Sequence, residues 1–256
     1  MAPPKSLREN TQSVSRYERQ NVLRRIHSLG RRVNRTTEQI QGLQKHSLAV
    51  SKVATALGRE LARRGAPVDV EGISRAALYH DVLRQRASFH LHPKTGRVEP
   101  STRLGTAERT SQDYLEHRHL KLVVGLMNRQ ARKHVAAGRL NEAEKLQRAA
   151  KILAKERWIM LLDKDFRDHL SLNDLVVLLG DALVEGNNFV PIDQRFESLA
   201  KRMGAYSADE IGDYRVSFDI LKHLAEERLH QQWGVDVNAV VRRLQAAKEK
   251  GVASKT

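Results

Sequence analysis

The sequence of 256 residues contains no cysteine, and this absence excludes several kinds of site at once. Disulfides, thiolate zinc sites, iron–sulfur clusters and cysteine nucleophiles all need a thiol. His, Asp and Glu therefore remain as the side chains that can hold a metal. The lack of disulfides is also typical of a protein from a reducing compartment.

Long apolar runs and aromatic residues are scarce as well. Apolar runs are short, as at 175–179, and the N-terminal Met-Ala-Pro-Pro-Lys lacks the apolar core of a secretion signal. With 5 Phe, 5 Tyr and 2 Trp, the core must be mostly aliphatic, and a stacking platform for single-stranded nucleic acid is disfavoured. The composition predicts a globular, soluble, cytoplasmic protein without a membrane span.

Positive charge, in contrast, is abundant, with a formal net charge of +15. Residues 1–35 hold nine Lys and Arg against two Glu, residues 118–157 hold eleven against three acidic residues, and residues 236–256 hold five against two. Charge of this sign attracts nucleic acid, nucleotides or anionic membrane surfaces. The alternative is that these regions are solvated helix faces that only aid solubility.

Helical periodicity dominates the chain and predicts an all-α fold. One apolar stripe precedes the helix stop at Gly65 and comprises Leu43, Val50, Val53, Leu57 and Leu61. Further helices are expected at 17–29, 71–84, 111–136, 141–166, 175–184, 214–231 and 236–250. Asn141 with Glu144, and Ser171 with Asp174, have the spacing of capping boxes.

The segment at 85–110 interrupts this pattern with proline and glycine. Phe89-His-Leu-His92 followed by Lys94-Thr-Gly96 predicts a long loop or a small hairpin inserted into the helical bundle. We therefore expect a basic N-terminal extension at 1–35, a helical domain at 36–235, and a basic C-terminal helix and tail at 236–256.

Two histidines and two carboxylates fall among the apolar helices. His46 lies on the apolar stripe, so its ring should point inward. His80 and Asp81 end the second expected helix, and Asp181 interrupts a very apolar one, where an unpaired carboxylate is costly to bury. Each alone is an ordinary buried polar residue. Together they could surround a divalent cation and leave positions for water and substrate.

This pattern resembles the HD superfamily of metal-dependent phosphohydrolases, whose signature is His…His-Asp…Asp. The matching segments are Gln44-Lys-His-Ser-Leu-Ala-Val50, Ala76-Ala-Leu-Tyr-His-Asp-Val-Leu-Arg84 and Leu178-Leu-Gly-Asp-Ala-Leu-Val-Glu-Gly186. Phe189-Val-Pro-Ile-Asp-Gln-Arg-Phe196 is similar to the segment that follows the last aspartate in bacterial HDIG-type members. The resemblance covers about residues 40–203 and implies an HD-type helical bundle that binds a divalent metal and hydrolyses phosphate esters, commonly of nucleotides.

Some features depart from the family pattern. The His-Asp-x-x-Glu and Val-Glu-Asp features of HD nucleotidases and alarmone hydrolases are missing. Members with two metals typically add adjacent histidines, and no adjacent pair occurs among His90, His92, His117, His119, His134 and His169. The resemblance therefore favours a single divalent ion, whether Mn, Co, Ni, Fe, Zn or Mg.

The resemblance also implies roles for individual residues. The metal ligands are His46, His80, Asp81 and Asp181. Asp81 could in addition orient the nucleophilic water, and Arg84 either neutralises charge on the phosphate or is an exposed arginine at a helix end. Judged by their positions beside His46 and in the long loop, Lys45, Lys94 and Arg97 are weaker candidates for substrate binding, and the alternative is that they face water. Glu185 is either a partner of the metal ligands or a solvated glutamate at a helix end.

The expected function is hydrolysis of a phosphorylated small molecule, a nucleotide phosphomonoester or phosphodiester, by attack of metal-activated water. The alternative is a catalytically inactive HD-like module that binds nucleic acid or a protein partner through its basic surface. A purely structural helical protein is the third possibility. Substrate identity and oligomeric state stay open.

Overall fold

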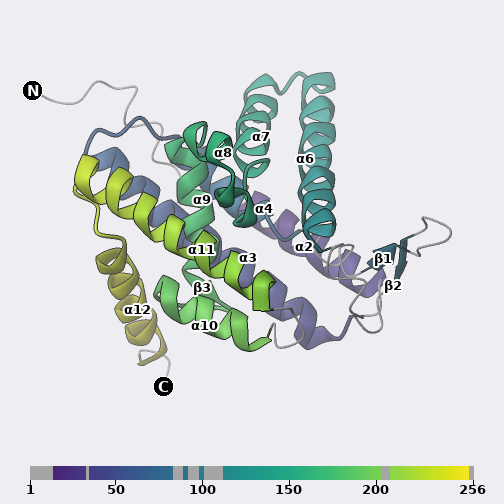
Figure 1. Cartoon of the computed structure of the whole chain (residues 1–256). Coiled ribbons are helices and arrows are strands. Elements are labelled where there is room, and N and C mark those ends of the chain that lie inside the picture. The colour runs from purple at the N-terminus through teal and green to yellow at the C-terminus, as the bar shows by residue number, and fades with distance from the viewer. Residues whose placement is uncertain are drawn as a thin grey trace, which may run out of the picture.

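A computed structural model describes residues 14–32, 35–82, 89–91, 98–100, 112–202 and 208–253. The fold is all-α, as the periodicity predicts, with two very small strand pairs (Figure 1). Its helices are α2 (Arg16–Arg32), α3 (Thr37–Arg63), α4 (Val70–Tyr79), α6 (Gln112–Ala136), α7 (Leu140–Leu153), α8 (Lys164–Asp168), α9 (Leu172–Ala182), α10 (Ile192–Arg202), α11 (Ala208–Ala225) and α12 (Val237–Ala253). A 3-10 turn, η2, covers Ile159–Leu162, and a π-helical turn, η3, covers Glu226–Gln231.

Helix α3 is the central element of the bundle. Thr36 begins it with a capping box, because its hydroxyl accepts from the Gln39 N–H while the Gln39 side chain accepts from the Thr36 N–H. The predicted stripe is buried from Val50 to Leu61, whereas Leu43 is only partly buried. Helices α2, α4, α9 and α12 pack against α3. Both basic ends of the described chain are thus part of one packed body.

Helices α6 and α7 form an antiparallel hairpin that rises from the rest of the bundle (Figure 1). Gly138 turns the chain between them with φ of +70°, a backbone conformation that favours glycine. Helix α7 packs against α4, and Arg148 donates through Nε to the N-cap Asp69 of α4 at 2.7 Å.

The predicted insertion contains a hairpin. Strands β1 (Phe89–Leu91) and β2 (Val98–Pro100) pair antiparallel, with Phe89 opposite Pro100. The second pair consists of β3 (Val184–Glu185) and β4 (Asn188–Phe189), which directly follow α9. The β1–β2 pair confirms the hairpin expected within 85–110.

Two sequence predictions about helices were wrong. The single helix expected at 141–166 is divided, since α7 ends at Leu153 and the η2 turn follows. Asp163 then begins α8 by accepting from the N–H groups of Asp165 and Phe166. The capping box at Asn141 does not form, since the N-cap of α7 is Arg139 and makes no side-chain cap. The box of Ser171 with Asp174 does form and begins α9.

None of the helices in the described part of the chain combines the length and apolar character that crossing a bilayer needs.

Candidate metal centre

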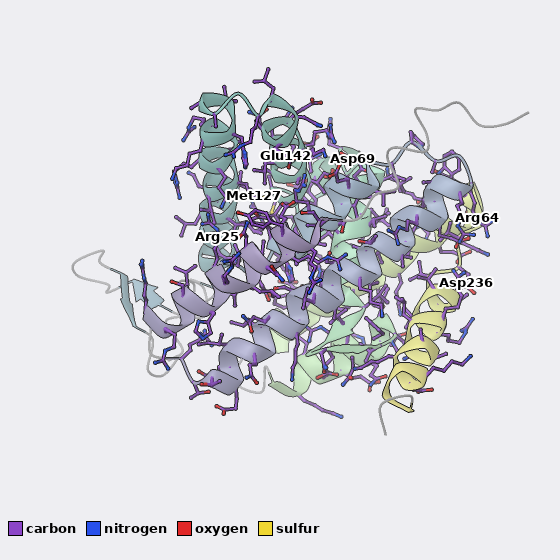
Figure 2. All side chains as sticks on the ribbon, turned by 180° about the vertical axis from the view of Figure 1, so that it is seen from behind. Arg25, Arg64, Asp69, Met127, Glu142 and Asp236 are labelled. Carbon is purple, nitrogen blue, oxygen red and sulfur yellow. The ribbon has the colours of Figure 1, made fainter. Side chains whose placement is uncertain are left out.

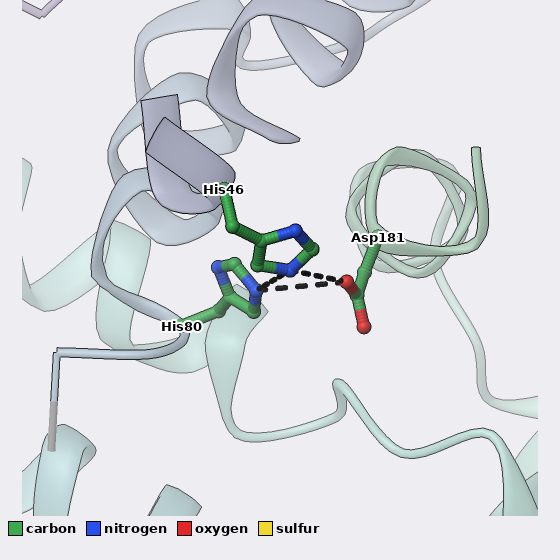
Figure 3. Close-up of side chains that lie close together, drawn as sticks. All are labelled: His46, His80 and Asp181. Atoms are coloured by element: carbon green, nitrogen blue, oxygen red, sulfur yellow. Dashed lines mark hydrogen bonds and ion pairs between the residues drawn. The ribbon is translucent and has the colours of Figure 1, made fainter. Parts of the chain in front are cut away.

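Three helices bring the predicted ligands together. His46 lies in the buried stripe of α3, His80 directly follows the last residue of α4, and Asp181 is the penultimate residue of α9. All three are less than a tenth exposed. Figure 3 shows the two imidazole rings and the Asp181 carboxylate pointing toward one another.

Gly180 allows the close approach of α9 to α3 that this meeting requires. A Cβ at position 180 would lie 2.9 Å from the Cβ of Ala54 and 3.4 Å from the carbonyl oxygen of Val50. Real Cβ atoms do not come so close to a neighbouring methyl group, so a larger residue would displace one helix from the other. The helix contact beside Asp181 therefore depends on glycine.

The distances between the side-chain atoms have the scale of a metal coordination shell. Nε2 of His46 lies 3.0 Å from Oδ1 of Asp181 and 3.3 Å from Nε2 of His80, and Nε2 of His80 lies 3.7 Å from Oδ1 of Asp181. Oδ2 of Asp81 is 3.6 Å from the Nε2 atom of each ring. Donors bound tetrahedrally at about 2.0 to 2.1 Å from zinc are about 3.3 Å apart. The four side chains that the sequence singled out thus present donor atoms around one small volume.

Backbone carbonyl groups fix the orientation of both rings. Nδ1 of His46 lies 3.0 Å from the carbonyl oxygen of Gly186, and Nδ1 of His80 lies 2.7 Å from that of Ala77. A carbonyl can only accept, so each Nδ1 carries a proton and donates it. In the neutral ring this leaves the Nε2 lone pair directed at the centre, as a metal ligand requires.

The carboxylates make the centre strongly attractive to positive charge. Burial favours the neutral ring of His80, but the Asp81 and Asp181 carboxylates outweigh it and raise the pKa of His80 to about 10. Burial likewise disfavours ionisation of Asp181, yet hydrogen bonds and charge from His46 and His80 keep the pKa of Asp181 well below its usual range. The cluster therefore holds a cation, either a proton or a metal ion, at neutral pH.

The β3–β4 pair and α12 support the His46 ring from behind. Gly186, which accepts from His46, stands at the turn of this pair with φ of +59°. Helix α12 holds the same turn, because Lys248 donates to the Asn187 carbonyl at 3.0 Å and Gln245 donates to the Phe189 carbonyl at 2.8 Å. The C-terminal helix is thus connected to the metal centre through a single turn.

Other predicted residues lie elsewhere or outside the described part of the chain. Arg84, Lys94 and Arg97 are among the residues the structure does not describe. Lys45 is exposed on α3, next to the inward-pointing His46. Glu185 is not at a helix end as expected, because α9 stops at Ala182 and Glu185 belongs to β3, where it accepts from the Ser198 hydroxyl.

Two neighbours of the His80 turn have no role predicted from the sequence. His119 of α6 is buried, and its Nε2 lies 2.6 Å from the carbonyl oxygen of His80. Glu156, which follows α7, adds to the negative field that raises the pKa of His80. No local motif marks either residue, since both reach the site only through packing of the α6–α7 hairpin.

Three helices of an all-α bundle supply two buried imidazoles and a buried carboxylate to one place. This arrangement is a candidate metal centre. Among the residues that the structure describes, His46, His80 and Asp181 are the group whose ligand atoms all lie within 4.8 Å of one another. Residues 43–164 match the family model of the HD domain. Residues 43–164 therefore carry an HD domain, as the signature implies.

The matched region ends before α9 and so includes three of the four signature residues. Asp181 lies outside the matched region, but the structure places its Oδ1 atom 3.0 Å from Nε2 of His46. No curated protein and no solved structure matches the chain.

Proposed function

We propose that the protein is a metal-dependent phosphohydrolase that cleaves phosphomonoesters or phosphodiesters of nucleotides. In this proposal His46, His80, Asp81 and Asp181 hold one divalent ion. The supporting observation is the convergence of two imidazoles and a carboxylate within 4.8 Å in a chain that carries an HD domain. The absence of cysteine supports a cytoplasmic location.

The donor set fits a borderline divalent ion such as Mn, Co, Ni, Fe or Zn, because it combines neutral imidazole nitrogens with carboxylate oxygens. When bound, such an ion lowers the pKa of a coordinated water and polarises a phosphoryl oxygen. Gly186 and Ala77 keep the two rings oriented through their carbonyl groups. These contacts leave the Nε2 atoms free to bind.

Asp81 has a second role in the proposal. Its Oδ2 lies 3.6 Å from both imidazole nitrogens, so its carboxylate can accept a hydrogen bond from the attacking water and take up its proton. Arg84, four residues after His80 in the sequence, would neutralise charge on the phosphate. Lys45, Lys94 and Arg97 would attract more distant phosphate groups of the substrate.

The test measures phosphate release by the full-length protein after metal removal and reloading with Mn²⁺, Co²⁺ or Ni²⁺. The substrates are p-nitrophenyl phosphate, bis-p-nitrophenyl phosphate and a panel of nucleotides. We expect metal-dependent hydrolysis that falls by roughly two orders of magnitude in Asp81→Asn, since loss of a proton acceptor typically costs about 10²-fold or more. The exposed His169→Gln variant is the control and should keep full activity.

Hydrolysis that is equal with and without metal would contradict the proposal. Bound metal without turnover of any ester would instead favour the inactive binding module considered from the sequence.

A further inference from the structure

Helix α2 carries a concentration of positive charge that the proposed activity does not use. Its 17 residues contain six arginines, no lysine and one acidic residue, Glu18. All six arginines are exposed, namely Arg16, Arg19, Arg24, Arg25, Arg31 and Arg32. We call these six side chains the arginine face.

Buried contacts hold this helix to the bundle and leave the arginine face outward. Val22 and Ile26 are fully buried on the opposite side of α2. Glu18 accepts from the buried Arg75 of α4 at 2.6 Å, which removes the only acidic group of α2 from the surface. The arginine face is therefore presented by a fixed helix.

No arginine of this face forms an ion pair with a residue in the described part of the chain, and Arg24 bonds only to the neutral Asn21. Some cations on other elements contact carboxylates, since Arg148 contacts Asp69, Lys222 contacts Asp193 and Arg243 contacts Glu60. On α2, six arginines are gathered on one helix of 17 residues whose single carboxylate is already paired with Arg75. The unpaired arginines are available to an external anion.

The unpaired charge continues from α2 onto α6. Gln130 of α6 joins the two helices, since its amide, oriented to satisfy both neighbours, donates to the Tyr79 hydroxyl and accepts from Arg25 at 2.8 Å. Figure 2 shows Arg25 where α2 meets the α6–α7 hairpin. Arg129, Arg132 and Lys133 are exposed on α6 near this junction in the sequence.

The spacing of the arginines suits an elongated anion. They fall in three pairs, 16 with 19, 24 with 25, and 31 with 32, which repeat about every seven residues or about 10 Å along a helix about 25 Å long. Guanidinium groups bind phosphate oxygens through two parallel hydrogen bonds, which the ammonium of lysine cannot do.

We infer that the arginine face binds the phosphate backbone of double-stranded nucleic acid without reading its bases. A membrane surface fits less well, because the apolar side of α2 is buried and Tyr17 is its one large exposed apolar side chain. Single strands fit less well because they need aromatic stacking, and this face offers only Tyr17.

This inference is independent of the proposed hydrolase activity. Gln44 of α3 donates to the Leu23 carbonyl of α2 at 2.8 Å, and it is about 200° around α3 from His46. The contact of α2 with α3 at Gln44 therefore lies on a side of α3 away from His46. A loss of nucleic-acid binding should leave the metal centre intact.

The test measures binding of the full-length protein to a fluorescein-labelled DNA duplex of about 25 base pairs. Fluorescence anisotropy is followed at KCl concentrations from about 50 to 200 mM. The variant Arg16→Gln/Arg24→Gln/Arg31→Gln removes one arginine from each pair. The matched control, Lys151→Gln/Lys201→Gln/Lys250→Gln, removes the same charge from exposed positions on three other helices.

We expect the wild type to bind with an affinity that falls linearly with the logarithm of salt. The slope should drop by about 2 to 3 in the arginine variant, since each phosphate contact contributes about 0.9 to it. The control should keep the wild-type slope. Arg16→Lys/Arg24→Lys/Arg31→Lys, which retains the charge, should keep the slope as well.

Three results would overturn the inference. They are an absence of duplex binding by the wild type at about 50 mM KCl, an equal loss of slope in the arginine variant and the lysine control, and binding to phosphatidylserine vesicles in preference to the duplex. Circular dichroism and metal content of each variant establish that the fold and the metal centre are unchanged.

Discussion

At the scale of single residues, the candidate site depends on which nitrogen of each imidazole is committed to the protein. The Gly186 and Ala77 carbonyls engage the Nδ1 atoms and direct both Nε2 atoms at the Asp181 carboxylate. The rings cannot both present lone pairs to each other at 3.3 Å without a cation between or beside them. A proton supplies this charge in the metal-free protein, and a metal ion would replace it.

The first prediction concerns pH. The folded-state pKa of His80 is raised to about 10, above the ordinary value of 6.5. In the metal-free protein its stabilising effect is therefore fully present below about pH 6.5 and is lost as pH rises toward 10. Because metal displaces this proton, we expect the apparent metal affinity to increase by about tenfold per pH unit between about pH 7 and 9.

Competition with a chromophoric chelator at several pH values measures this affinity. Calorimetry in buffers of different ionisation enthalpy counts the protons released. Affinity that does not change over this range, with no proton released, would show that the raised pKa of His80 does not belong to a metal-binding group.

At the scale of helices and strands, the sequence predicted those features that depend on residues close together in the chain. The inward position of His46 followed from its place on the α3 stripe, and the start of α9 followed from Ser171 and Asp174. The end of α7 at Leu153 was missed, because no glycine or proline follows it in the sequence before α8. The support of His46 by α12 could not be predicted, since Lys248 and Asn187 are 61 residues apart.

The second prediction tests the contact between α9 and α3. Gly180→Ala places a methyl group 2.9 Å from the Ala54 Cβ, so we expect a loss of about 1 to 3 kcal/mol in unfolding free energy and weaker metal binding. Chemical denaturation and metal titration measure the two effects. Gly42→Ala in α3 is the control, because nothing lies within 4 Å of its new methyl group, and it should stabilise the protein slightly. Equal behaviour of the two variants would contradict the packing argument.

The third prediction tests the connection from α12 to the metal centre. Gln245→Ala/Lys248→Ala removes the helix contacts to the Asn187 and Phe189 carbonyls. We expect metal affinity to fall by about tenfold, as for loss of groups that orient a ligand. Glu249→Ala/Lys250→Ala changes exposed neighbours on the same helix and should bind metal as the wild type does. Unchanged metal affinity in Gln245→Ala/Lys248→Ala would show that these contacts of α12 do not support the metal centre.

At the scale of the whole molecule, the two proposals assign anion binding to two different places. The metal centre joins α3, α4 and α9 inside the bundle, whereas α2 packs on the outside of α3 and α4. The net charge of +15 predicted anionic partners, but it could not separate a catalytic pocket from a docking surface. The division of the chain at 1–35, 36–235 and 236–256 stays a prediction.

The fourth prediction follows because the centre ties three helices together. A ligand that binds only the folded state at 100 times its Kd adds about 2.7 kcal/mol of stability. For a chain of this size we expect saturating metal to raise Tm by about 5 to 10 °C. Differential scanning calorimetry with and without metal measures the shift. The absence of any shift, with metal bound, would mean that the ion also binds the unfolded chain.

The most direct test of the metal centre is the metal content of the untagged protein, determined by elemental analysis and by titration with Mn²⁺, Ni²⁺ and Zn²⁺. The wild type is compared with His46→Gln/Asp181→Asn, which preserves side-chain size, and with the exposed control His169→Gln. We expect about one divalent ion per chain in the wild type and the control, and none in the double variant with an unchanged circular dichroism spectrum. A wild type that neither retains nor binds any of these metals would contradict the account and leave the buried cluster as a structural feature of the fold.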